Sequence, residues 1–296
     1  MATLRASLSS GPISGASAER VDMKFEVVVI PVADVDRSKE FYTGVVGFEV
    51  KHREGRTALL GPHGGPALLE LEEQAGVQAL GRRSRLGLYH VAYLLPTREA
   101  LGGFARSLIR KGVEFGAGDH LYSEAIYLTD PDGLGVEVYA DRARDTWRMR
   151  GREIMGATLP LQFAELPEAE WTGAPAGTRV GHVHLAVGDL AEASRFYHET
   201  LGMDVVTWSY PGALFVSAGG YHHHVGLNVW AAGQPAASQE DARLLHWELE
   251  LPGAEAVNAV RSRMSAAGFA PVEVAGEEGF RDAWCTTVVP RAAREA

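Results

Sequence analysis

The sequence predicts an α+β protein made of four consecutive β-α-β-β-β units. Two observations support this prediction. The order of one strand, one helix and three short strands recurs four times along the chain. The two halves of the chain also repeat one another, since residues 32–35 align with residues 187–190 and His90 aligns with His246. Such internal similarity indicates a duplicated architecture.

The first unit begins with residues 24–32, whose alternating, Val-rich pattern predicts a strand. A helical pattern over residues 36–46 ends at Gly47, and glycine is the usual residue just past a helix end. Three short strands are then predicted, at residues 48–52, 57–61 and 67–72.

The second unit repeats this order, with a strand over residues 88–95 and a helix over 97–111 that ends at Gly112. The spacing of the apolar residues puts Leu101, Phe104, Leu108 and Ile109 on one helix face. Three strands follow, at residues 113–116, 122–129 and 134–140, with a turn at Asp130-Pro131-Asp132-Gly133 before the last.

The third and fourth units begin near residues 180 and 244. We therefore expect a first pair of units over residues 23–141 and a second pair over 179–296. The polar, charged, Pro-containing residues 142–178 are expected to form a linker. The small, Ser- and Gly-rich residues 1–22 are expected to form a disordered leader.

Composition narrows the functional class. Hydrophobic residues make up 46% of the 296 residues, which is enough for a sizeable core. The net charge of -10, from 28 basic and 38 acidic residues, argues against nucleic-acid binding. The sequence shows no apolar run of the ~18–20 residues that span a membrane. The single cysteine, Cys285, excludes an internal disulfide, and we expect a cytoplasmic protein.

Four motifs carry a resemblance to a known family: Leu-Tyr-His-Val at 88–91, the run 127–137, Gly-His-Val-His-Leu at 181–185, and 221–227. With the four units, they resemble the vicinal oxygen chelate superfamily. Within it, the chain is similar to the two-domain extradiol ring-cleavage dioxygenases of the catechol 2,3-dioxygenase type. The resemblance covers roughly residues 24–290. It implies two cupped mixed β-sheet barrels with helices outside, the glyoxalase/bleomycin resistance/dioxygenase fold.

The resemblance also implies that two units build one cup, into which the first and last strands of each unit can aim a metal ligand. The first-strand positions are Val27, His90, His182 and His246. Among the last strands, the second unit offers Glu137 and the first offers Glu70 or Glu72. The last strand of the fourth unit, expected at 284–287, offers no carboxylate.

The pairing of units decides the ligand set. Units three and four would give His182 and His246 without a carboxylate, and units one and two would give His90 and Glu137 with Val27. Units two and three give His90, His182 and Glu137. Only this set has two imidazoles and one carboxylate, the facial triad of non-haem Fe(II) oxygenases. We therefore expect units two and three to hold Fe(II), or Mn(II) with the same ligands, and units one and four to be structural.

Each ligand also has a competing interpretation. Taken alone, His90 could be a core histidine and Glu137 could face solvent on a half-exposed strand. His184 competes with His182, because residues two apart share one strand face. Alignment with the family favours His182. His246 has no partner carboxylate and is interpreted as structural.

Ring cleavage also needs an acid–base group, and histidine suits this task because its ordinary pKa is near 6.5. Residues 222–224 are three histidines on a predicted strand, where His223 would face opposite to its neighbours. The resemblance places the acid–base histidine at His223, although such a run could instead be an adventitious metal-binding tract. It also implies that Tyr127 hydrogen-bonds the substrate, unless it is a core tyrosine. His120 is a third candidate, at a spacing shifted from that of the family.

The sequence therefore predicts an Fe(II)-dependent extradiol dioxygenase that inserts O2 into catechol or a substituted catechol with ring cleavage. One alternative is a glyoxalase-like metal-dependent isomerase or lyase, whose sites carry more carboxylate or glutamine ligands. Another is a non-catalytic small-molecule-binding module of the bleomycin-resistance type, which lacks the triad. The expected partners are the aromatic substrate and O2, and a homo-oligomer is left open.

Overall fold

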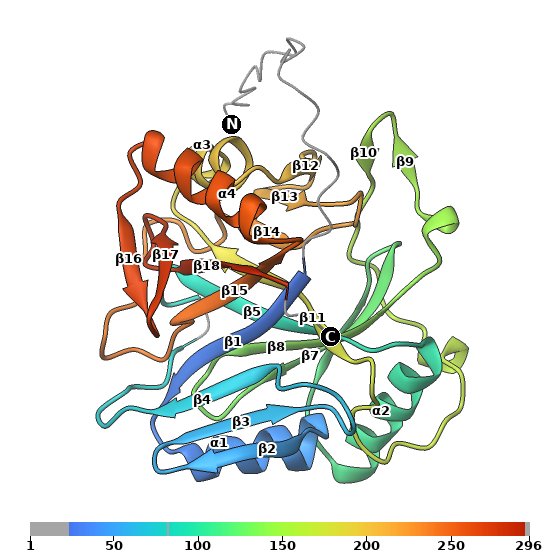
Figure 1. The fold of residues 1–296 in the computed structure, drawn as a ribbon. Coiled ribbons are helices and arrows are strands. Elements are labelled where there is room, and N and C mark those ends of the chain that lie inside the picture. Colours follow the sequence, from blue (N-terminus) through green and yellow to red (C-terminus); the bar gives the residue numbers. More distant parts are fainter. Residues whose placement is uncertain (1–23, 82, 294–296) are drawn as a thin grey trace.

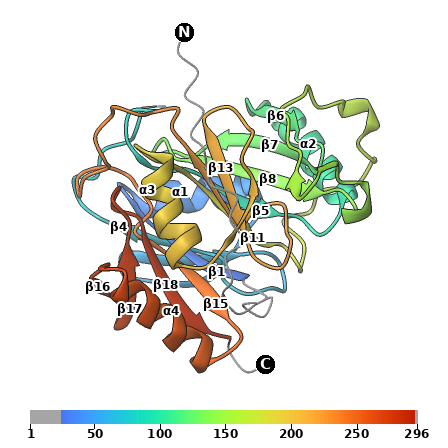
Figure 2. The same cartoon turned by 90° about the horizontal axis from the view of Figure 1, so that it is seen from above.

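The computed structural model describes residues 24–81 and 83–293, which form two eight-stranded mixed β-sheets with helices on their outer sides (Figures 1 and 2). The predicted α+β class is confirmed. The predicted leader, residues 1–22, lies outside the described residues. No helix in the described ranges is long and apolar enough to cross a membrane.

The first sheet joins units one and four, in the order β16-β17-β18-β15-β1-β4-β3-β2. Its strands are β1 (Lys24–Val32), β2 (Glu49–Glu54), β3 (Thr57–Gly61), β4 (Leu69–Glu73), β15 (His246–Leu251), β16 (Pro271–Val274), β17 (Glu277–Arg281) and β18 (Thr287–Ala292). At its centre, β1 pairs antiparallel with β15 and parallel with β4. The sheet is thus assembled across the two halves of the chain.

The second sheet joins units two and three, in the order β12-β13-β14-β11-β5-β8-β7-β6. Its strands are β5 (Gly87–Leu94), β6 (Gly116–Asp119), β7 (Ser123–Thr129), β8 (Gly135–Asp141), β11 (Arg179–Ala186), β12 (Asp204–Thr207), β13 (Ala213–Ser217) and β14 (Val225–Asn228). Its central strand β5 pairs antiparallel with β11 and parallel with β8. The two sheets therefore share one topology.

The α-helices are α1 (Val35–Phe41), α2 (Arg98–Lys111), α3 (Leu190–Ser194) and α4 (Ala254–Ala266). The π-helical turns η1 (Tyr42–Val46) and η4 (Arg195–Thr200) continue α1 and α3. The predicted helix ends are confirmed at Gly47 and Gly112, which adopt φ angles of 86° and 66°. Of the four residues expected on one face of α2, Leu101, Phe104 and Leu108 are buried, whereas Ile109 is 60% exposed.

The segment expected to be a linker, residues 142–178, is ordered and packs along the second sheet. It contains two short strands and two 3-10 turns: β9 (Met149–Arg150), β10 (Glu153–Ile154), η2 (Arg144–Thr146) and η3 (Phe163–Glu165). Ile154, Leu161 and Leu166 are buried. The Arg106 guanidinium on α2 donates to the carbonyls of Leu166 and Pro167, at 3.0 and 2.6 Å. Side-chain burial and these bonds fix a segment whose composition is polar.

Three predicted strands are placed too early. The strand predicted at residues 113–116 is β6, Gly116–Asp119. β14 begins at Val225, after the His222–His224 run, because Gly219 and Gly220 adopt φ angles of 61° and 68° and turn the chain there. β18 begins at Thr287 rather than at 284, because the Asp282 carboxylate accepts the backbone N–H of Trp284 and holds a turn. The histidine run is therefore a bend and not a strand.

Candidate metal centre and its cavity

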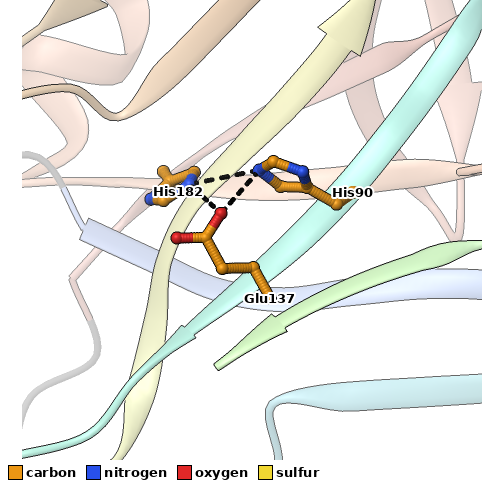
Figure 3. Close-up of side chains that lie close together, drawn as sticks. All are labelled: His90, Glu137 and His182. Atoms are coloured by element: carbon orange, nitrogen blue, oxygen red, sulfur yellow. Dashed lines mark hydrogen bonds and ion pairs between the residues drawn. The ribbon is translucent and has the colours of Figure 1, made fainter. Parts of the chain in front are cut away.

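Three neighbouring strands of the second sheet bring the predicted ligands together (Figure 3). On the central strand β5, Ala92 pairs with His182 of β11 on one side and with Glu137 of β8 on the other. His90 lies two residues before Ala92 and so faces the same side of the sheet. The register alone therefore directs all three side chains to one point.

The distances within this cluster suit a single metal ion. The Glu137 Oε2 atom lies 3.0 Å from His90 Nε2 and 3.4 Å from His182 Nε2. The two imidazole Nε2 atoms are 3.4 Å apart. Metal–ligand bonds of about 2.0–2.2 Å place neighbouring donor atoms about 3.0–3.5 Å apart. One atom from each residue can therefore bind one ion at ordinary bond lengths, and these three side chains form a candidate metal-binding site.

Burial sets the protonation state of the cluster. His90, Glu137 and His182 are only 5%, 2% and 2% exposed. Burial lowers the pKa of His182 to about 4, so its imidazole is neutral at pH 7. Burial opposes ionisation of Glu137, yet the adjacent His182 and His90 hold the pKa of this carboxyl well below its usual range. A neutral imidazole and an ionised carboxylate are the forms that bind metals.

His223 lies beside the cluster, with its ring centroid 4.1 Å from that of His182 and 4.8 Å from that of Phe215. Burial lowers its pKa well below the ordinary value. The expected alternation of the histidine run is wrong, because the run is not a strand. His222 and His223 hydrogen-bond to each other, whereas His224 turns away, and its Nδ1 accepts the backbone N–H of Ala218.

Tyr127 on β7 pairs directly with Glu137 on β8. Its hydroxyl lies 2.5 Å from His120 Nε2, and His120 Nδ1 lies 2.8 Å from the Ala157 carbonyl. Since a carbonyl only accepts, His120 Nδ1 carries the proton when the ring is neutral, and Nε2 accepts from the Tyr127 hydroxyl. The structure therefore brings both candidates together despite the shifted spacing of His120. Burial, followed by the Glu137 charge, raises the pKa of Tyr127 well above its usual value.

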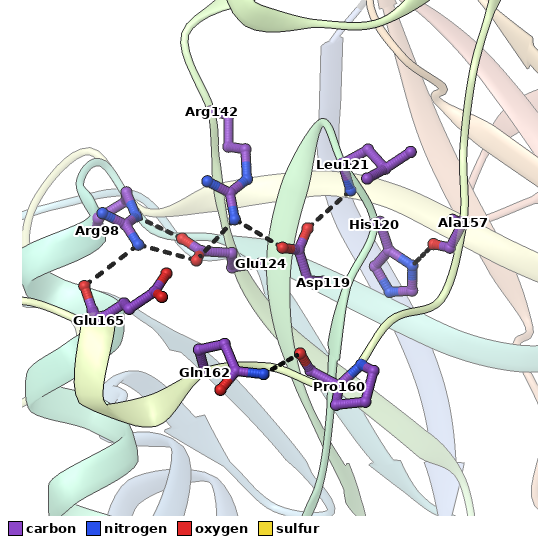
Figure 4. A network of polar contacts seen from close by, with 10 residues as sticks. All are labelled: Arg98, Asp119, His120, Leu121, Glu124, Arg142, Ala157, Pro160, Gln162 and Glu165. Atoms are coloured by element: carbon purple, nitrogen blue, oxygen red, sulfur yellow. Dashed lines mark hydrogen bonds and ion pairs between the residues drawn. The ribbon is translucent and has the colours of Figure 1, made fainter.

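A charged network holds the loop that carries His120 (Figure 4). Arg142 donates to the carboxylates of Asp119 and Glu124, at 2.8 and 3.0 Å. Glu124 is buried and also accepts from Arg98. The other Asp119 oxygen accepts the Leu121 backbone N–H at 2.8 Å, which fixes the turn just after His120. Sequence reasoning did not find this support, because it joins residues on separate elements.

A cavity of about 730 Å³ opens onto the cluster. His90, Glu137, His182, His223, Tyr127 and His120 all line it. Aromatic side chains that the sequence did not single out form much of the remaining wall: Tyr89, Tyr122, Tyr210, Phe215 and Trp230. His184, considered in the sequence only as a rival ligand, also lines the cavity. Its buried Nε2 has no hydrogen-bond partner among the described residues. A planar, partly polar small molecule fits such a lining.

Comparison with known proteins agrees with this architecture. The family model for the Glyoxalase/Bleomycin resistance protein/Dioxygenase superfamily matches residues 24–138 and 179–287. The chain is 42% identical over 260 residues to a catechol-2,3-dioxygenase of Bacillus subtilis (strain 168), a match covering 85% of this chain and 90% of that protein.

Two solved structures share the fold. One is a protein from Bacillus subtilis subsp. subtilis str. 168, with a TM-score of 0.64 and 15% identity, covering 92% of this chain and 86% of that one. The other is glyoxalase I from Zea mays, with a TM-score of 0.56 and 18% identity, covering 91% and 92%. At these identities the likeness concerns the fold only. Because the family model spans most of the chain, the chain belongs to the Glyoxalase/Bleomycin resistance protein/Dioxygenase superfamily.

Proposed function

We propose that the protein is an extradiol dioxygenase that cleaves catechol or a substituted catechol with O2. His90, His182 and Glu137 would hold one divalent metal ion, with Fe(II) as the main candidate and Mn(II) as the alternative. The observation that carries the proposal is the buried cluster of two histidines and one glutamate, in a chain 42% identical to a catechol-2,3-dioxygenase. When bound, the metal supplies open coordination positions for the two substrates and the redox chemistry between them.

The absence of a fourth ligand at one matching position favours this function over a glyoxalase-like isomerase. Within unit three, His184 of β11 pairs with Gly226 of β14, just as Ala92 pairs with Glu137 in unit two. Gly226 therefore stands where unit two has its carboxylate. A side chain there has no room, because a Cβ on Gly226 would lie 2.8 Å from the His184 ring. No carboxylate can therefore reach the metal-binding cluster from this position.

The surrounding residues have complementary tasks in this proposal. His223 is buried and neutral beside the cluster, so it can accept the proton that a catechol hydroxyl loses on binding and return it later. The Tyr127 hydroxyl donates its only proton to His120 Nε2, so its oxygen can accept a hydrogen bond from a substrate hydroxyl. The aromatic wall of the cavity positions the planar ring and limits the access of water.

The test is anaerobic loading of the metal-free protein with Fe(II), Mn(II) or Zn(II), followed by catechol and air-saturated buffer. We expect O2 uptake and a yellow ring-cleavage product with Fe(II), and neither signal with redox-inert Zn(II). The rate of O2 uptake with Mn(II), compared with the rate with Fe(II), shows which metal supports the reaction better. Absence of O2 uptake across a panel of catechols, by protein shown to contain stoichiometric Fe(II), would overturn the proposal.

A further inference from the structure

A row of hydrogen-bonded side chains runs from the cavity into the protein, and the proposed function uses only its last member. Asp141 Oδ1 lies 2.9 Å from His222 Nε2, and His222 Nδ1 lies 2.8 Å from His223 Nδ1. His222 is 0% exposed and His223 is 5% exposed. Asp141 follows Glu137 by four residues on β8, so both side chains leave the same face of that strand.

The positions of the protons in this row follow from its ends. A carboxylate only accepts hydrogen bonds, so His222 Nε2 carries a proton and donates to Asp141. In a neutral imidazole the other nitrogen then has a lone pair, so His222 Nδ1 accepts. Its partner is His223 Nδ1, which must therefore be the protonated nitrogen of His223. Both rings are buried, and burial disfavours the charged form of an imidazole.

The middle of the row is clamped in place. The Tyr122 ring stacks on His222 at 4.4 Å with an interplanar angle of 16°, and the Tyr221 ring contacts it at 4.0 Å. The Tyr221 hydroxyl donates to Asp141 at 3.2 Å and lies 2.7 Å from the Tyr139 hydroxyl. These contacts leave His222 little freedom to rotate and exchange its two nitrogens.

The far end of the row reaches water. The Asp141 side chain is 24% exposed and lines a second hollow together with Arg142 and Arg98. A carboxylate in contact with water keeps its charge at a lower desolvation cost than a buried one. The row thus has a charged, hydrated end at Asp141 and a buried end at His223, in the wall of the active cavity.

We propose that Asp141 and His222 are positioning residues, which hold His223 in its Nδ1-protonated tautomer and leave Nε2 free to accept the substrate proton. This inference rests on the proposed function for its consequence in catalysis. The hydrogen-bond arrangement itself can be measured without turnover. A hydrogen-bonded residue often fixes the tautomer and orientation of a functional histidine. Loss of such a residue typically lowers activity by about 10–100-fold.

Two substitutions of His222 separate positioning from mere support. His222→Phe keeps a planar ring against Tyr122 but removes both nitrogens. His222→Gln keeps an acceptor for His223 Nδ1–H and a donor for Asp141. We expect His222→Phe to lower kcat by about 10–100-fold with KM for catechol and metal content unchanged. His222→Gln should recover kcat to within a few-fold of the unaltered protein. His246→Gln, in the other sheet, is the matched control and should leave kcat unchanged.

The direct readout is ¹⁵N NMR of histidine-labelled, metal-free protein, with the His223 signals assigned from the spectrum of His223→Ala. Two-bond nitrogen–proton couplings identify the protonated nitrogen of each ring. We expect the Nδ1–H tautomer for His223 in the unaltered protein and in His222→Gln, and a mixture of tautomers in His222→Phe. If His222→Phe does not fold, Asp141→Ala makes the same test, because it leaves His222 Nε2–H without its acceptor.

The inference is overturned if His223 keeps one tautomer and full kcat in His222→Phe. It is also overturned if the Phe and Gln variants lose kcat equally, in proportion to lost metal, because that outcome shows support only. Failure of the proposed function looks different: Fe(II)-loaded unaltered protein would not consume O2 with any catechol. In that case the NMR measurement still decides whether Asp141 and His222 set the tautomer.

Discussion

The two sheets have the same strand order and central register, yet only one carries the metal-binding cluster. In the first sheet, Val29 of β1 pairs with His246 of β15 and with Glu70 of β4. In the second sheet, Ala92 occupies the matching place between two members of the cluster. The first sheet therefore keeps a histidine and a glutamate at corresponding positions, and the register selects Glu70 over Glu72.

The difference lies in side chains and not in the backbone. Val27 stands where the second sheet has His90, so the first sheet lacks one imidazole. Arg291 on β18 also lies near His246. Burial, followed by the Arg291 charge, lowers the pKa of His246, and Arg291 forms an ion pair with Glu248 at 3.1 Å. Among the described residues, one cluster has three possible metal ligands. Each sheet therefore provides backbone positions for the same three metal ligands. In the first sheet, one missing histidine and a nearby arginine are enough to prevent a metal-binding cluster.

Paired ligand substitutions test the comparison with the largest expected effect. Glu137→Ala removes the carboxylate of the cluster and should weaken metal binding by more than about 100-fold, since even neighbours of ligands typically contribute 10–100-fold. Glu70→Ala removes its counterpart and should retain stoichiometric metal. Metal content after dialysis against a metal buffer measures both. Equal losses from the two variants would mean that the sheets share the metal-binding role.

The next largest effect concerns the acid–base residue, which also has a counterpart. The register that pairs Val183 with Val225 in one sheet pairs Trp247 with Val288 in the other, so Thr286 stands where the second sheet has His223. His223→Ala should keep the metal and bind catechol, yet slow turnover by about 10²–10⁴-fold, the usual acid–base contribution. Thr286→Ala should leave turnover unchanged. Steady-state O2 uptake measures both, and normal turnover in His223→Ala would assign the proton transfer elsewhere.

Much of the fold could be predicted because its signals are local. Alternating apolar residues mark the central strands, and Gly47 and Gly112 end helices at the expected residues. The duplication then supplied the positions to be compared between units. The composition of the cluster could also be predicted, since His90, His182 and Glu137 depend only on which strands are neighbours.

Features set by contacts distant in sequence could not be predicted. The bend that carries His222 depends on two left-handed glycines and on Asp141, which lies 81 positions away in the chain. His120 reaches Tyr127 only because the Ala157 carbonyl and the arginine network hold its loop. Spacing along the chain says nothing about such loop conformations, so the shifted position of His120 was uninformative.

The pH dependence of stability should reveal the histidine that the first sheet retains. Burial, followed by the charge of Arg291, lowers the pKa of His246 from 6.5 to about 4. Between these values the unfolded chain binds the extra proton and the folded protein does not. The stabilisation is therefore complete above pH 6.5 and is lost as the pH falls through about 4.

In metal-free protein, His246→Gln should reduce the pH-dependent loss of unfolding free energy by up to about 3 kcal/mol, at 1.36 kcal/mol per pKa unit. Urea unfolding at several pH values between 4 and 7 measures the slope. The control is Thr286→Ala, at a buried residue directly before β18 without an ionisable side chain, which should leave the slope unchanged. An unaltered slope in His246→Gln would show that folding does not lower the pKa of this histidine.

The smallest expected effect tests why the second sheet has no fourth ligand at Gly226. Gly226 of β14 corresponds to Val289 of β18, so the first sheet accepts a side chain where the second has none. Gly226→Ala would place a Cβ 2.8 Å from the His184 ring and should cost about 1–2 kcal/mol of unfolding free energy by overpacking. Gly44→Ala, in the helical turn η1 and with open space around the added Cβ, should not lower stability. Because His184 lines the cavity, Gly226→Ala should also raise KM for catechol. Unchanged stability and KM would mean that the ring yields without cost, so steric exclusion by His184 would not explain the absent fourth ligand.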